Sequence, residues 1–364
     1  MKTKSILLGL CALAATCVQA GNPLKMAVGT YTDTNSRGIY SFDFDQKTGK
    51  ATSLGVLDLK NPSYLTFSKD GKYIYAVSET NDKKASINCI SFNQKDGKMK
   101  LLNTQPTNGE APCYVEADER MAITANYSGG SMSIFPILPD GTLDKCQRLF
   151  GGHTGGPDQT RQNRPHIHCV KLTPDGYIFA TDFSADQILR FKYSKESGYI
   201  YIDEAPIAAK IGKDSGPRHL TFSPEGKHAY LMNELSGRVT VFDHADGRLT
   251  EIQSVPTNNA KSRGGADIHV SPDGKFLYAS NCLKADGIAI FKIDKETGKL
   301  TKTGYQTTGT HPRNFAITPN GKFLLVACRD SNKIQVFSRN PETGLLSDTH
   351  QDIKLSKPAC IQFG

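Results

Sequence analysis

The amino-acid sequence predicts an all-β protein, a seven-bladed β-propeller built from four-stranded antiparallel blades. The first observation is a strand-like segment that ends at a turn glycine and occurs seven times, at Gly49, Gly97, Gly141, Gly198, Gly247, Gly298 and Gly344. The second is the mean spacing of these glycines, which is close to 49 residues. The third is a hairpin motif that precedes most of the copies. Repetition at a fixed period of this length is typical of propellers, in which each repeat forms one blade.

Each blade is predicted to begin with its innermost strand, a segment that in most repeats starts at a proline. This segment occurs at 62–67, 112–116, 165–170, 217–222, 266–270, 312–317 and 358–363. A turn of the Asp-Gly-Lys type and a β-rich segment follow it at 69–77, 174–181, 224–230, 272–279 and 319–326. A tight turn between two β-rich runs indicates a hairpin, so this segment is the second strand.

The third strand is the alternating segment that ends at the turn glycine, for example 38–42, and a looser fourth strand follows it, as in 51–59. The termini divide one blade between them. The first repeat starts at its second strand, 26–31, and the chain ends with an inner strand, 358–363. We expect this C-terminal strand to complete the N-terminal blade and close the ring, because closure removes the exposed edges of an open array.

The first twenty residues have the pattern of an export signal. Two lysines precede an apolar stretch that is too short to span a bilayer and is followed by small residues up to Ala20. We expect 1–20 to be a signal peptide, 21–364 to be one propeller domain, and the protein to be periplasmic or secreted. A lipid anchor at Cys17 is the alternative.

The composition excludes several function classes. The net charge of +8 comes from lysines and arginines scattered through turns, which argues against nucleic-acid binding but favours a small anionic substrate. No window beyond the signal is apolar enough to span a membrane. Seven cysteines outside it lack paired spacing, so no disulfide framework is predicted, although a single pair stays open. No short-spaced trio of ligands is present, and we expect neither a metal nor a cofactor.

Two sets of polar residues are predicted to meet at one end of the propeller axis. In each blade the inner strand runs along the axis and the second strand runs back antiparallel to it. The residues at the start of the inner strand and those just after the second strand therefore lie at the same end of the axis. The first set is His166, His168, Arg218, His219, Asp267, His269 and Arg313, and the second is Glu79, Asn126, Asp182 and Glu234. Imidazoles, guanidinium groups and carboxylates together suit acid–base chemistry on an anionic substrate.

Each of these residues also has a structural interpretation. A histidine can line the channel through hydrogen bonds, and an arginine can pair with Glu234 or Asp267 to neutralise a crowded channel. Asn126 and Asp182 occupy equivalent positions in different blades, which favours a role in turns. An insertion at 151–158, where the spacing of the turn glycines grows to 57 residues, is predicted to form a lid beside the pocket.

The sequence resembles the propeller-type 6-phosphogluconolactonases and their relatives, the carboxy-cis,cis-muconate lactonizing enzymes. The resemblance spans 21–364 and rests on the segments 28–32 (VGTYT), 125–130 (ANYSGG), 164–168 (RPHIH) with 181–183 (TDF), 216–219 (GPRH) with 233–234 (NE), and 311–313 (HPR). It implies a catalytic group of one histidine, two arginines and a glutamate. These fall on His168 or its neighbour His166, Arg218, Glu234 and Arg313.

The resemblance implies hydrolysis of a sugar δ-lactone, either 6-phosphoglucono-δ-lactone or a related aldonolactone. A histidine or Glu234 would take a proton from water, one arginine would stabilise the oxyanion, and the other would hold a phosphate or carboxylate. Substrate-binding residues are expected among Asn126, Asp182, His219, Asp267, His269 and Glu79.

Export separates the protein from cytoplasmic sugar phosphates, which makes an unphosphorylated or uronic lactone the nearest alternative substrate. A different class of function is a non-catalytic exported propeller that binds a ligand or a protein on the same face. We expect a monomer or a weak homodimer.

Overall fold

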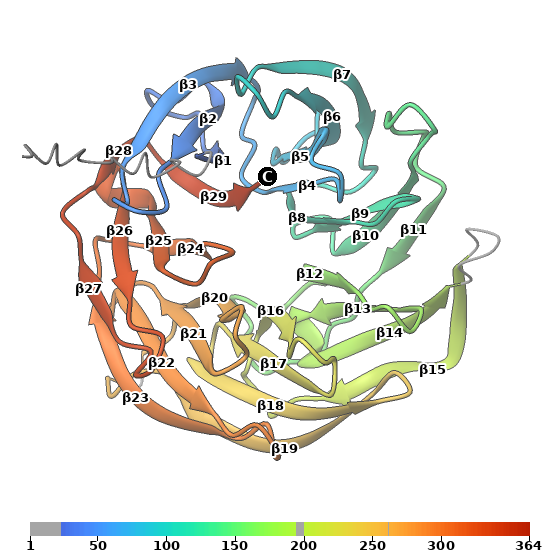
Figure 1. Ribbon diagram of the computed structural model, residues 1–364. Coiled ribbons are helices and arrows are strands. Elements are labelled where there is room, and N and C mark those ends of the chain that lie inside the picture. The colour runs from blue at the N-terminus through green and yellow to red at the C-terminus, as the bar shows by residue number, and fades with distance from the viewer. Residues whose placement is uncertain (1–22, 194–199, 261) are drawn as a thin grey trace, which may run out of the picture.

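Seven antiparallel sheets surround a central axis in the computed structural model (Figure 1). The structure describes residues 23–193, 200–260 and 262–364. Six of the sheets have four strands, and in the seventh the outermost position is shared by β27 and β28, which both pair with β26. The predicted seven-bladed β-propeller is therefore confirmed.

The two strands nearest the axis form a hairpin in each blade, as the Asp-Gly-Lys turns predict. The inner strands are β4 (Leu65–Phe67), β8 (Pro112–Ala117), β12 (Ile167–Leu172), β16 (Pro217–Phe222), β20 (Gly265–Val270), β24 (Pro312–Ile317) and β29 (Pro358–Phe363). The second strands are β1 (Leu24–Thr30), β5 (Tyr73–Ser78), β9 (Met121–Asn126), β13 (Tyr177–Asp182), β17 (His228–Asn233), β21 (Phe276–Asn281) and β25 (Phe323–Cys328).

The outer half of each blade is a second hairpin that ends in solvent. The third strands are β2 (Gly38–Phe44), β6 (Ser86–Phe92), β10 (Ser131–Pro136), β14 (Gln187–Tyr193), β18 (Arg238–Ala245), β22 (Gly287–Ile293) and β26 (Lys333–Arg339). The outermost strands are β3 (Ala51–Asp58), β7 (Met99–Pro106), β11 (Arg148–Gly151), β15 (Ile200–Lys210), β19 (Arg248–Pro256), β23 (Leu300–Thr307), β27 (Leu346–Asp348) and β28 (Ile353–Lys354). The described chain adds only two short 3₁₀ helices, η1 (Phe183–Ala185) and η2 (Arg329–Ser331).

One inner strand is shorter than predicted. The segment 62–67 pairs only over Leu65–Phe67, because the chain turns just before it. Asn61 has a φ of 42°, and the N–H of Ser63 donates to its carbonyl at 2.8 Å. The start of this segment therefore lies in a turn instead of in the sheet.

The core lies between the blades, around the second strands. Every residue of β9, β21 and β25 is buried. A sheet that is covered on both faces needs near-continuous apolar strands, which explains why runs such as 323–328 are apolar without alternation.

The turn glycines that reveal the repeat, where they fall within the described ranges, contact the preceding blade. Gly344 has a φ of +73°, and a Cβ placed there would lie 2.4 Å from the ring of Phe276 in β21. Its carbonyl accepts a hydrogen bond of 2.7 Å from the hydroxyl of Tyr278. The same type of bond joins Tyr75 to Gly141 at 2.9 Å and Tyr230 to Gly298 at 3.1 Å. Backbone conformation and close packing thus both require glycine at this turn.

The ring closes as predicted, with β29 as the inner strand of the N-terminal blade. β29 pairs antiparallel with β1, with Val28 opposite Ile361. The N–H of Ile361 also donates to Asn314 Oδ1 in β24 at 2.8 Å, which ties this strand to the neighbouring blade. The first and last strands of the chain therefore share one sheet (Figure 1).

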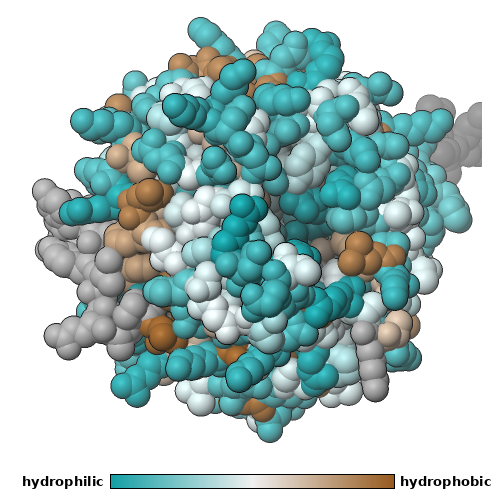
Figure 2. Space-filling model, turned by 180° about the vertical axis from the view of Figure 1, so that it is seen from behind, coloured by the Kyte–Doolittle hydropathy of each residue, from teal (hydrophilic) through white to brown (hydrophobic). Residues whose placement is uncertain are grey.

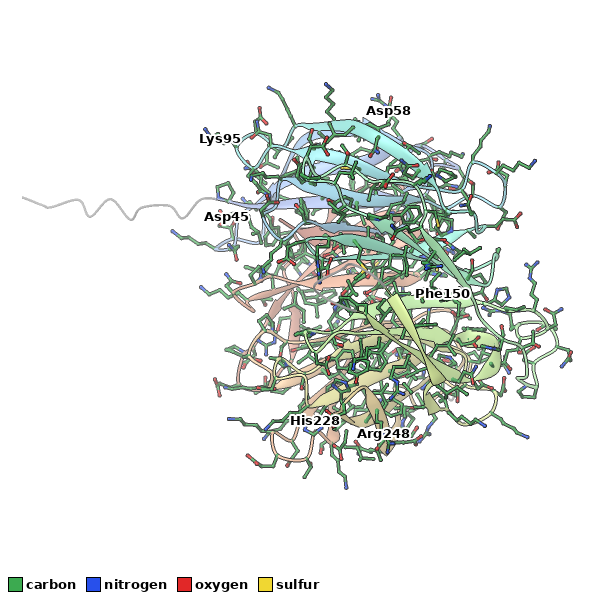
Figure 3. All side chains as sticks on the ribbon, turned by 90° about the vertical axis from the view of Figure 1, so that its right-hand side faces the viewer. Asp45, Asp58, Lys95, Phe150, His228 and Arg248 are labelled. Atoms are coloured by element: carbon green, nitrogen blue, oxygen red, sulfur yellow. The ribbon has the colours of Figure 1, made fainter. Side chains whose placement is uncertain are left out.

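Antiparallel order places the turns between first and second strands, and between third and fourth strands, on one side of the disc. Figure 3 shows Asp45 and Lys95, which belong to two of these turns, on the same side. The connections that lead into the inner strands lie on the opposite side.

The predicted signal peptide, 1–20, lies outside the described residues. Within the described ranges, no helix has the length and apolarity that a membrane crossing requires. The seven cysteines in these ranges are all free, so the single pair left open by the sequence is not formed.

Candidate functional site

A cavity of about 610 Å³ lies on the axis, at the end where the inner strands begin and the second strands end. The antiparallel register brings these positions together, as in the pairing of Pro217 with Asn233. Figure 2 shows this face of the molecule, which is mostly hydrophilic and hollowed near its centre. Five of the predicted residues line the cavity, namely Glu79, His168, Arg218, Glu234 and Arg313.

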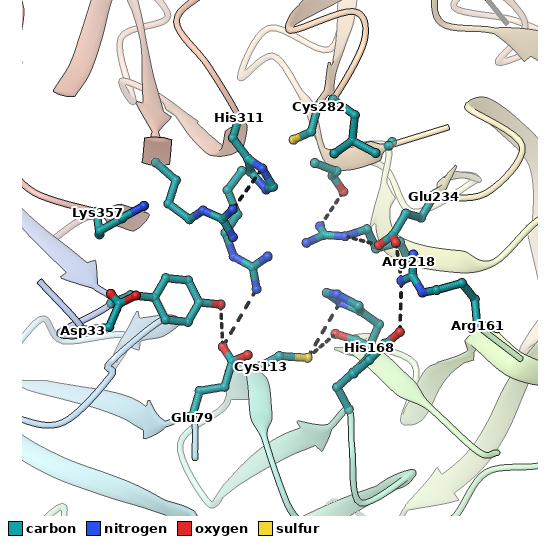
Figure 4. Close-up of a pocket in the computed structure, with 18 residues that line it drawn as sticks. Asp33, Glu79, Cys113, Arg161, His168, Arg218, Glu234, Cys282, His311 and Lys357 are labelled. Atoms are coloured by element: carbon teal, nitrogen blue, oxygen red, sulfur yellow. Dashed lines mark hydrogen bonds and ion pairs between the residues drawn. The ribbon is translucent and has the colours of Figure 1, made fainter. Parts of the chain in front are cut away.

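On one side of the cavity, Glu234 lies between two arginines (Figure 4). Arg218 Nε donates to Glu234 Oε2 at 3.2 Å, and Arg161 Nη2 donates to Oε1 at 2.5 Å. Arg218 Nη1 also donates to the carbonyl of Ala266 at 2.7 Å, so two of its three nitrogens are fixed. The predicted contact between Arg218 and Glu234, at the start and the end of one blade's inner hairpin, is present.

On the other side, Arg313 pairs with Glu79. Arg313 Nη2 lies 3.9 Å from Glu79 Oε2, which also accepts a hydrogen bond of 2.8 Å from the hydroxyl of Tyr31. Burial raises the pKa of Tyr31 above its usual value, so the phenol stays protonated as the donor. The guanidinium of Arg313 lies over the Tyr31 ring, 5.2 Å from its centre. Arg313 thus pairs with Glu79 and not with Asp267.

His168 lies between these two pairs and is only 5% exposed. Burial lowers the pKa of its imidazole well below the usual value, and the positive charges of Arg218 and Arg313 act in the same direction. The ring is therefore neutral near pH 7. Its Nδ1 lies 3.8 Å from Cys113 Sγ, and burial raises the pKa of that thiol, which keeps the sulfur protonated.

The cavity carries an excess of positive charge. Its wall includes four arginines and one lysine, against three carboxylates at Asp33, Glu79 and Glu234. Arg329 and Lys357 both pair with Asp330, at 2.9 Å each. Burial and the neighbouring arginines lower the pKa of His311 to about 3, so this histidine adds no charge at neutral pH. Such a site attracts anionic or strongly polarised ligands.

The predicted residues His219, Asp267 and His269 form a separate cluster that does not line the cavity. Asp267 accepts hydrogen bonds from His219 Nδ1 at 2.7 Å and His269 Nε2 at 2.9 Å. These bonds hold the pKa of the buried Asp267 well below its usual value, whereas burial lowers that of His219 to about 4. The ring centre of His219 lies 5.1 Å from that of His168, so the cluster supports the cavity histidine from behind.

Three further predicted residues lie away from the central cavity. The Asn126 amide donates to Ser131 and Ser133 of its own blade, and Asp182 accepts bonds from Gln187 and His153; both are fully buried. His166 stacks on the ring of Tyr127 at 4.1 Å and lines a second, smaller hollow. The turn role weighed for Asn126 and Asp182 matches these contacts, and neither side chain reaches the space a substrate would occupy.

The segment that follows the insertion contributes a cavity residue that the sequence did not reveal. Asp158 pairs with Arg263 from the loop before β20, which holds the insertion against the propeller face. Arg161, a few residues further on, reaches Glu234 and the Tyr127 hydroxyl. It has no counterpart in the other repeats, and this is why the repeat pattern could not identify it. Tyr31, by contrast, lies inside the 28–32 motif and could have been named.

Within the described ranges, no group of three side chains has the arrangement needed to hold a metal ion. The cavity offers the neutral imidazole of His168, which can accept a proton, and guanidinium groups, which can donate hydrogen bonds and carry positive charge.

The chain is similar to known proteins over almost its whole length. A family model described as "Lactonase, 7-bladed beta-propeller" matches residues 25–363. A 6-phosphogluconolactonase of Formosa agariphila is 37% identical over 348 residues, which cover 93% of this chain and 99% of that protein.

Solved structures show the same similarity. A "putative 6-phosphogluconolactonase" from Bacteroides uniformis superposes with a TM-score of 0.93 at 56% identity, covering 94% of this chain and 100% of that one. The periplasmic gluconolactonase of Pseudomonas aeruginosa superposes with a TM-score of 0.87 at 32% identity, covering 93% and 98% of the two chains.

Proposed function

The chain belongs to the family of seven-bladed β-propeller lactonases and is a lactone hydrolase, and from this premise we propose that its central cavity is where a sugar lactone is hydrolysed. The observation that carries the proposal is the position of neutral His168 between Arg218 and Arg313 in one cavity. A proton acceptor beside two fixed cations is what attack of water on an ester carbonyl requires.

In the first step, His168 accepts a proton from a water molecule while the water oxygen bonds to the lactone carbonyl carbon. The negative charge that develops on the carbonyl oxygen is stabilised by a guanidinium. Arg218 suits this role because Glu234 and the Ala266 carbonyl fix two of its nitrogens, so little reorganisation is needed when charge develops.

In the second step, the tetrahedral intermediate collapses and the bond between the carbonyl carbon and the ring oxygen breaks. The leaving ring oxygen takes the proton from His168, which returns the imidazole to its neutral form. The product is the open-chain aldonic acid, which ionises to its anion. Arg313, held by Glu79 over the Tyr31 ring, provides the second positive charge for this product.

The substrate is a sugar δ-lactone, either 6-phosphoglucono-δ-lactone or a related unphosphorylated aldonolactone. Names of relatives support both choices, since one is a 6-phosphogluconolactonase and another a periplasmic gluconolactonase. Export through the 1–20 segment would place this enzyme outside the cytoplasm. We expect it to be a monomer or a weak homodimer.

The test is hydrolysis of glucono-δ-lactone and 6-phosphogluconolactone above their spontaneous rates. Glu234→Gln removes the charge that orients Arg218, and we expect kcat/KM to fall about 100-fold, as for other lost groups that position an oxyanion donor. Glu251→Gln is the matched control, because Glu251 is exposed on the outer strand β19. Equal rates for the two variants would place the reaction elsewhere.

A further inference from the structure

A second hollow, of about 330 Å³, opens beside the central cavity. It is lined by Tyr127, Thr160, Arg161, Asn163, Arg164 and His166. Tyr127 and Arg161 line both spaces and so form the wall between them. The two spaces are therefore adjacent.

The hollow has the chemistry of an anion site. Its lining offers two guanidinium groups, two hydroxyls, an amide and an imidazole, and includes no carboxylate. No acidic side chain in the described ranges forms an ion pair with Arg164, whereas Arg329 and Lys357, which line the central cavity, both pair with Asp330. An unpaired guanidinium presents the planar set of donors that suits a phosphate or a carboxylate.

Arg161 connects this hollow to the reaction site. Its two side-chain bonds, to Glu234 at 2.5 Å and to Tyr127 at 3.1 Å, both leave from Nη2. Its Nε and Nη1 donate to no side chain in the described ranges, and both Arg161 and Arg164 line the hollow. The segment that carries both arginines follows Asp158, which Arg263 fixes to the propeller; Arg263 also pairs with Asp214.

We infer that this hollow is the subsite for an anionic substituent of the substrate, a phosphate or carboxylate on a lactone whose ring occupies the central cavity. The inference rests on the proposed function and deepens it, because it makes Arg164 a determinant of specificity for charged lactones. His166, which the sequence placed with the catalytic group, then belongs to the wall of this subsite.

The experiment compares Arg164→Met with Lys213→Met, which removes an exposed lysine outside both spaces. For Arg164→Met we expect KM for 6-phosphogluconolactone to rise about tenfold, as for loss of one charge-assisted hydrogen bond. The kcat, and both constants for glucono-δ-lactone, stay within about twofold of wild type. Inorganic phosphate competes with 6-phosphogluconolactone in the wild type, and its inhibition constant rises about tenfold in the variant.

A carboxylate-bearing aldarolactone, assayed in parallel, identifies which anion the subsite prefers. Unchanged constants for both charged lactones in Arg164→Met overturn the subsite, as does an equal rise in KM for the neutral lactone. In either case wild-type turnover of glucono-δ-lactone leaves the proposed function standing. If the wild type hydrolyses none of these lactones, both proposals fail.

Discussion

The environment of a single residue, His168, determines how the reaction should depend on pH. The pKa of its imidazole lies well below 6.5, so His168 is protonated, and thereby lost as a base, only in more acidic solution. We expect kcat/KM for glucono-δ-lactone to stay level as the pH falls from 8 to 6. An imidazole with the ordinary pKa would lose about three quarters of its active form by pH 6.

Variants connect this pH profile to the residue. His168→Gln should lower kcat at least about 100-fold at every pH, because it removes the proton acceptor. His350→Gln changes an exposed histidine at the rim of the molecule and should keep the wild-type profile. A loss of activity with a midpoint near 6.5 would show that a solvent-exposed histidine, and not His168, is the base.

Residue by residue, the sequence predicted the cavity unevenly. The pairing of Arg218 with Glu234 followed from their places at the two ends of one hairpin. Asn126 and Asp182 are the last residues of β9 and β13, and their side chains bond within their own blades. Glu79 and Glu234 each lie one residue beyond a second strand, and the prediction did not use this one-residue difference, which reverses side-chain direction along a strand. Arg161 follows the insertion 151–158 and has no equivalent residue in the other repeats, so its contact with Glu234 is visible only in the folded chain.

Among the elements, β29 has the largest consequence for stability, because it closes the ring. Ile361 is fully buried between β1 and the neighbouring blade. We expect Ile361→Ala to lower the free energy of unfolding by about 3 kcal/mol through lost burial and the cavity left behind. Urea denaturation followed by circular dichroism measures this change.

Lys354→Ala, on the exposed outer strand β28, is the control and should change the free energy by less than about 0.5 kcal/mol. A similarly small effect of Ile361→Ala would mean that the ring does not depend on this closure.

The strands nearest the axis were easier to predict than the outer ones. Inner and second strands follow prolines and Asp-Gly-Lys turns, whose backbone requirements are local. Outermost strands pair with only one neighbouring strand, so their sequences are less constrained, and the last of them is divided into β27 and β28. The strand β4 was predicted too long because a turn at Asn61 replaces its start.

At the scale of the whole molecule, seven similar blades produce one asymmetric cavity. The repeats supply the same backbone around the axis, and the residues that break the repeat supply the chemistry. The scattered positive charge of the sequence, +8 in total, becomes a local excess only where Arg161, Arg218, Arg313 and Arg329 face the same space. The composition suggested an anionic ligand, and the fold gathers positive side chains at the central cavity.

The most direct test of a reaction in the central cavity is a crystal structure of the protein with gluconate, the product of glucono-δ-lactone. We expect its carboxylate to lie about 3 Å from nitrogens of Arg218 or Arg313, with its C1 end facing His168. Gluconate bound outside this cavity, in a crystal of enzyme that hydrolyses the lactone, would contradict the proposed site.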